Sequence, residues 1–133
     1  MDFNLAPLNV RRDIDMPGCI HRAAKCTRHR ALWRFFRRAG PTIVPSTRST
    51  ICHTRKIAEW TRGRDLEIMR RSAFGMIRIY NLLPQVVVDH IDVKSFQNAL
   101  TQLVRNKLNN GDPTWRFLLS SRHPLFNTHP LRR

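Results

Sequence analysis

Residues 69–108, MRRSAFGMIRIYNLLPQVVVDHIDVKSFQNALTQLVRNKL, form the longest stretch in which apolar residues recur with a helical period. After Asp92 the apolar residues follow steps of three and four, which is typical of an amphipathic helix. They are Val93, Phe96, Leu100, Leu103, Val104 and Leu108. Asp92 is a good N-cap for this helix, and residues 109–111, Asn-Asn-Gly, predict its end. This stretch predicts the core of the protein.

An earlier helix is expected to begin near Asp65 and to end at Pro84, because the residue before a proline is pushed out of the helical region. Gly75 argues against one unbroken helix there. The run Val86–Val88 is β-branched and extended by preference, but it is too short to imply a sheet. Asp112 and Pro113 predict the start of a last short helix.

The N-terminal part contains a weaker helical pattern over residues 8–20, and the pair Pro17-Gly18 predicts a break or kink in it. A second helix is expected from about Cys19 to Lys25. Residues 39–54 contain two prolines and several Ser and Thr without a sustained period, so they are expected to be linker or disorder.

The predicted fold is therefore mostly α: a small helical domain or partial domain with a disordered basic middle segment. We expect four segments. They are a looser basic helical arm over residues 1–38, a disordered linker over 39–64, a helical core over 65–120 and an irregular tail over 121–133.

The net charge is +15, and 20 of the 24 basic residues are arginine. Residues 19–64 contain twelve Lys or Arg against one acid, Glu59. The guanidinium fork can bind two phosphate oxygens at once, so RNA or DNA is the first partner to consider. An orphan or degenerate reading frame from GC-rich DNA, with no selected biochemical activity, would be equally rich in arginine. Composition does not separate these two interpretations.

The basic region also contains aromatic residues, and Trp33, Phe35 or Phe36 could stack on exposed bases while arginines contact the phosphates. The candidate nucleic-acid-binding residues are Arg22, Lys25, Arg28, Arg30, Arg34, Arg37, Arg38, Trp33 and Phe36. Such binding would be weak, salt-dependent and non-specific. The alternative is that the aromatic side chains pack on the downstream helices and the arginines are only solvated.

Catalysis and metal binding have less support in the sequence. Cys19, His21, Cys26 and His29 have zinc-binding side chains, and Cys52-His53 follows downstream. Their spacing, C-x-H-x4-C-x2-H, is not that of a zinc knuckle or a two-Cys, two-His finger, so a small zinc-binding module is the least favoured alternative. The chain has no nucleophile elbow, phosphate-binding glycine loop or carboxylate cluster. We expect no enzyme activity, cofactor or metal.

Three cysteines are an odd number, and no apolar run precedes them that would serve as a secretory signal. The longest apolar runs are a few residues, far short of a membrane span. We therefore expect a soluble intracellular protein, cytoplasmic or nuclear, with no membrane partner.

Two parts of the chain resemble the C-terminal tail of non-LTR (LINE-type) retrotransposon reverse transcriptases. In residues 6–36 the resemblance is carried by APLNVRRDIDM, GCIHRA and the start of FFRR. In residues 69–108 and 115–131 it is carried by RRSAFGMIRIYNLLPQVVVD, VKSFQNAL and SRHPLFNTHPL. The latter follow the family pattern R-S-x-F/L-G-x4-Y/W-N-x-L-P-x2-V-V-D…V-x2-F-Q-x2-L.

The resemblance implies ancestry more than activity. The polymerase carboxylates of the family lie in an upstream Tyr-x-Asp-Asp motif, which is not in this sequence. The segments Pro17-Gly18 and Lys25–Arg30 depart from the family pattern, which suggests a truncated or degenerate copy. The resemblance implies a non-catalytic fragment that supports the remainder of a reverse transcriptase and contacts template RNA or target DNA.

Overall fold

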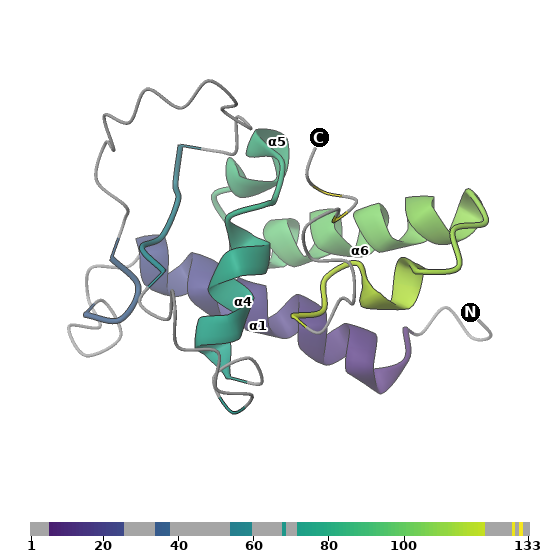
Figure 1. The fold of residues 1–133 in the computed structure, drawn as a ribbon. Coiled ribbons are helices and arrows are strands. Elements are labelled where there is room, and N and C mark those ends of the chain that lie inside the picture. The colour runs from purple at the N-terminus through teal and green to yellow at the C-terminus, as the bar shows by residue number, and fades with distance from the viewer. Residues whose placement is uncertain are drawn as a thin grey trace, which may run out of the picture.

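The computed structural model describes residues 6–25, 34–37, 54–59, 68, 72–121, 129 and 131. Within these ranges the chain is mostly α-helical and has no strand, so the predicted fold class is confirmed (Figure 1). The elements are α1 (Leu8–Lys25), α4 (Ala73–Tyr80), α5 (Gln85–Val88), α6 (Val93–Asn109) and the 3-10 helix η2 (Trp115–Phe117). The predicted helix start at Asp65 and most of the predicted disordered linker lie outside the described residues.

Helix α1 packs against both α4 and α6, while α5 and η2 contact α6 (Figure 1). One hydrophobic cluster joins these elements. Its largest fully buried apolar side chains are Tyr80, Phe96, Ile20, Ile57, Ile77, Ile79, Leu83, Leu100 and Leu118. Most of them lie between residues 69 and 108, as expected, but α1 contributes to the same cluster and is not a loose arm.

Helix α6 follows the local rules of helix formation at both ends. The Asp92 side chain accepts hydrogen bonds from the backbone N–H groups of Lys94 and Ser95, so the predicted cap is confirmed. The helix ends at Asn109, and Gly111 follows with φ +71°, in the left-handed region that glycine adopts most readily. Phe96, Leu100 and Val104 are its buried residues, and they belong to the predicted apolar stripe.

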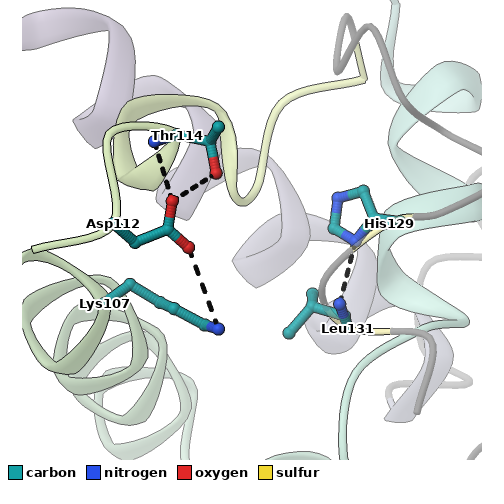
Figure 2. Close-up of polar contacts among 5 residues, drawn as sticks. All are labelled: Lys107, Asp112, Thr114, His129 and Leu131. Carbon is teal, nitrogen blue, oxygen red and sulfur yellow. Dashed lines mark hydrogen bonds and ion pairs between the residues drawn. The ribbon is translucent and has the colours of Figure 1, made fainter. Parts of the chain in front are cut away.

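The Asp112 side chain stabilises the turn after α6. One carboxylate oxygen, Oδ1, accepts hydrogen bonds from the Thr114 backbone N–H at 2.8 Å and from the Thr114 hydroxyl at 2.7 Å (Figure 2). The other, Oδ2, lies 3.9 Å from Lys107 Nζ. The predicted short helix is present as η2, and the buried Leu118 and Leu119 follow it. Farther along the chain, the buried His129 accepts a hydrogen bond at Nδ1 from the Leu131 N–H.

One of two expectations for residues 72–89 was wrong. As expected, no single unbroken helix runs from Asp65 to Pro84, because α4 has its N-cap at Ser72, which accepts a hydrogen bond from the Phe74 N–H, and ends at Tyr80. Helix α4 itself runs through Gly75, which is buried. The three valines expected to be extended lie in the helical turn α5. The helical cost of a valine is below about 0.7 kcal/mol, whereas burying its side chain gains about 1.5 kcal/mol or more. Burial of Val87 and Val88 therefore outweighs their β preference.

Helix α1 is continuous through Pro17-Gly18, so, of the predicted break or kink, the break was wrong. Pro17 cannot donate to the carbonyl of Asp13, four residues earlier, which weakens the helix locally. Gly18 has a packing role, since a Cβ there would lie 2.8 Å from Gln97 Nε2 of α6. That Nε2 donates a hydrogen bond to Asp15 Oδ1 at 3.1 Å. Helix α1 therefore contacts α6 where its own sequence has the lowest helix propensity.

Candidate nucleic-acid interface

We call the C-terminal end of α1, together with segments 34–37 and 54–59, the basic end of the molecule. Segments 34–37 and 54–59 are joined by a hydrogen bond from the Ala58 N–H to the Arg37 carbonyl at 2.9 Å. The Arg55 guanidinium donates to the Val88 carbonyl at 2.8 Å, which places segment 54–59 beside α5 (Figure 1). The basic residues of this end are Arg22, Lys25, Arg34, Arg37, Arg55 and Lys56.

The Asn81 side chain attaches segment 54–59 to the C-terminal end of α4. Asn81 Oδ1 accepts a hydrogen bond from the Ile57 N–H at 2.9 Å, and its Nδ2 donates to the Ile57 carbonyl at 2.8 Å. Ile57 is 1% exposed and belongs to the core cluster. These six residues fall inside the predicted disordered linker, so that expectation was wrong for them: the Asn81 amide pairs with the backbone as a neighbouring strand would.

The buried His21 fixes the C-terminal end of α1. Its Nε2 lies 2.9 Å from the His90 carbonyl, and its Nδ1 lies 3.0 Å from the Tyr80 hydroxyl. A carbonyl oxygen only accepts, so in the neutral ring Nε2 carries the proton and the Tyr80 hydroxyl donates to Nδ1. The ring also stacks on Phe96, with centroids 4.1 Å apart and planes 2° from parallel. One imidazole therefore joins α1 to α4, to α6 and to the turn before α6.

Lys25 donates a hydrogen bond to the same His90 carbonyl at 2.6 Å. Burial lowers the pKa of Lys25 below its ordinary value of 10.5, and the nearby Arg55 lowers that pKa further, while Asp89 and Asp92 raise it. Lys25 is thus hydrogen-bonded to a backbone carbonyl and lies in the electrostatic field of two carboxylates. It is a poorer phosphate ligand than its sequence position predicts.

The exposed cations of the basic end are Arg22, Arg34, Arg37 and Lys56. The first three were predicted binding residues; Lys56 was missed because it lies in the predicted linker. Glu59, the acid of segment 54–59, lies 3.8 Å from the Arg78 guanidinium. The predicted binding residues Arg28, Arg30, Trp33 and Arg38 lie outside the described residues.

The two phenylalanines of segment 34–37 differ in exposure. Phe36, the predicted stacking residue, is only 7% exposed and stacks on Phe74 of α4, with centroids 6.1 Å apart. Its ring is packed on a downstream helix and has no open face for a base. Phe35, the other phenylalanine considered for stacking, is 51% exposed and forms a T-shaped pair with Phe74, with centroids 5.7 Å apart. Adjacent aromatic residues carry no sequence signal that tells the buried one from the exposed one.

The candidate zinc ligands differ in their surroundings. Cys19 is exposed, whereas His21 is buried with both ring nitrogens at hydrogen-bonding distance from other groups. Cys26, His29, Cys52 and His53 lie outside the described residues. Among the residues that the structure describes, no group of three or more His, Cys, Asp or Glu side chains is arranged to hold a metal ion.

Comparisons of the chain with protein-family models, with curated protein sequences and with solved structures gave no match. Within the described ranges, no helix combines the length and the apolar character needed to span a bilayer. Within the described residues, the basic end combines exposed cations and the exposed Phe35 ring with a packed helical support.

Proposed function

We propose that this chain is a non-catalytic, nucleic-acid-binding fragment related to the C-terminal tail of a LINE-type reverse transcriptase. The observation that carries the proposal is the contact between the two parts of the chain that resemble the family. His21 belongs to the Ile-His-Arg step of the first part, and its partners Tyr80 and Phe96 belong to the pattern of the second. Residues of one inherited pattern are expected to pack on each other when they form one structural unit.

The second resembling part also supplies structural contacts elsewhere. Asn81, which follows Tyr80 in the pattern, holds segment 54–59 in place. Val87 and Val88 of the Val-Val-Asp step are buried in the core. The residues of the second resembling part therefore form the core and hold segment 54–59, which supports a structural role and not a catalytic one.

Binding would be electrostatic, through Arg22, Arg34, Arg37 and Lys56, the exposed cations of the basic end. Each phosphate contact adds about one unit to the slope of log K against log salt. The partners would be RNA or DNA without sequence preference, and the remainder of a reverse transcriptase. The fragment would act inside the cell, in the cytoplasm or nucleus.

The binding proposal is tested by fluorescence anisotropy with labelled RNA and DNA over a salt series. The triple variant R22A/R34A/K56A is expected to lose about tenfold or more in affinity near 0.1 M salt and to lower the salt slope by about three. The matched control is R12A/R105A/R116A, which removes the same charge from other parts of the molecule. Equal losses in both triple variants, or no binding by the wild-type chain at low salt, would overturn the proposed interface.

The ancestry is tested separately from the genomic DNA. We expect the flank immediately upstream to encode, in some frame, a Tyr-x-Asp-Asp segment. Unrelated sequence there would remove the relationship to a reverse transcriptase while leaving the binding result intact.

A further inference from the structure

Phe35 is an aromatic ring that the fold holds in place without burying it. Phe35 is 51% exposed, although its ring forms a T-shaped pair with that of Phe74, with centroids 5.7 Å apart and planes at 72°. Arg34 and Arg37 are exposed in the same four-residue segment. Burying an exposed aromatic face against another aromatic ring is favourable. Because cations flank this face, the partner that fits it best is an anion that also carries aromatic rings.

The surroundings of Phe35 fix its position before any partner binds. On one side Phe36 is 7% exposed and stacks on the same Phe74 ring, with planes 21° apart. After Phe36, the Arg37 carbonyl accepts a hydrogen bond from the Ala58 N–H, and the residue before Ala58, Ile57, is hydrogen-bonded to the Asn81 side chain. A ring held in this way loses little conformational freedom on binding, so more of the stacking energy contributes to affinity.

We propose that Phe35 stacks on an unpaired base while Arg34 and Arg37 contact phosphates of the same strand, so that this end of the molecule prefers single-stranded nucleic acid. Bases in a duplex are already stacked on both faces and offer none to a side chain, whereas every unpaired base offers one regardless of sequence. This inference rests on the proposed function and names the form of nucleic acid that the same interface takes.

The experiment compares wild type, F35A, F35Y and F117A. The probes are a 12-nucleotide oligo-dT, a 12-nucleotide oligo-U and a 12-base-pair DNA duplex, each measured by anisotropy at one fixed salt concentration. Phe117 is the matched control, because it is 46% exposed and follows an arginine, Arg116, but lies on η2 outside the basic end. Thermal unfolding of each variant checks that the fold is retained.

F35A is expected to lose about 5- to 100-fold in affinity for both single strands and to change duplex affinity less than twofold. F35Y, which keeps the ring, and F117A should bind all three probes like wild type. The inference is overturned if F35A weakens single-strand and duplex binding alike, or weakens neither. If wild type binds none of the probes at low salt, the proposed function itself has failed, and that outcome is distinct from binding without strand preference.

Discussion

Helices α1 and α6 are nearly equal in length, 18 and 17 residues, but they depend on different kinds of interaction. Helix α6 has a side-chain cap at Asp92, an uninterrupted interior and three buried residues. Helix α1 has Pro17 and Gly18 in its middle and eight buried residues. The helix with the poorer local sequence is the one with more of its residues inside the protein.

This difference indicates where each helix gets its stability. Helix α6 satisfies propensity, capping and amphipathic pattern by itself, and packing adds to these. Helix α1 is kept helical by contacts from elsewhere in the chain: the His21 ring between Tyr80 and Phe96, and the close approach of Gln97 to Gly18. Changes to tertiary contacts should therefore act most strongly on α1, and changes to local signals on α6.

Removing the His21 ring should have the largest effect. His21→Ala deletes a fully buried side chain, its stacking on Phe96 and its hydrogen bonds to Tyr80 and His90, and is expected to lower the free energy of unfolding by about 3 kcal/mol. Chemical denaturation followed by circular dichroism measures it. The neighbouring exposed Arg22→Ala is the control and should stay within about 0.5 kcal/mol of wild type. Similar losses in both variants would break the comparison.

Replacing Pro17 should stabilise α1. Pro17→Ala restores an N–H that can donate to the Asp13 carbonyl, and alanine is about 3 kcal/mol more favourable than proline in a helix interior. Lost packing of the buried ring and a freer unfolded chain reduce the net gain to about 1–2 kcal/mol. Denaturant midpoints of the two proteins measure it. A loss of stability would show that the proline ring itself holds α1 against its neighbours.

Removing the cap of α6 should cost less than removing His21. Asp92→Ala leaves the N–H groups of Lys94 and Ser95 without their side-chain acceptor, which is worth about 1 kcal/mol. A synthetic peptide of residues 92–110 should show the same dependence on Asp92 in its helical circular dichroism, whereas a peptide of residues 6–25 should be nearly unstructured. Equal helicity in the two peptides would contradict the assignment of local stability to α6.

The smallest effect concerns the charge of Lys25, at the end of α1. Because its pKa is lowered in the folded protein, the unfolded chain binds more protons in the pH range just below 10.5, so the contribution of Lys25 to stability rises with pH there. The wild-type free energy of unfolding minus that of Lys25→Met should therefore increase between pH 8 and pH 10. A constant or falling difference would mean that Asp89 and Asp92 dominate.

The same division explains which parts of the fold could be predicted from sequence. Helix α6 was predictable to within a residue at each end because Asp92, its apolar stripe and Gly111 act locally. The continuity of α1 and the helical turn at Val86–Val88 were not, since both depend on burial against segments distant in sequence. The low helix propensity of these residues is visible in the sequence. The tertiary contacts that outweigh it are not, because they involve residues far away in the chain.

For the candidate interface, the excess of positive charge could be predicted from the sequence, but which aromatic side chains are exposed could not. The excess of arginine near α1 is visible in the sequence, and Arg22, Arg34 and Arg37 are exposed as expected. Sequence did not separate Phe35 from Phe36, because which ring faces Phe74 depends on the path of a non-helical segment. It also missed Lys56, whose segment is held by contacts with Asn81, Gln85 and Val88, all more than 20 residues farther along the chain.

The His21 contacts have a consequence for synthesis on the ribosome. The partners of His21 lie 59 and 69 residues later in the chain. At about 5–20 residues per second, Tyr80 and His90 are added roughly 3–14 seconds after His21. During that interval α1 has emerged without the residues that stabilise it, and its apolar face is open to chaperones or to other nascent chains. Products that terminate before Tyr80 should therefore be unfolded and rapidly degraded, even though they contain all of α1.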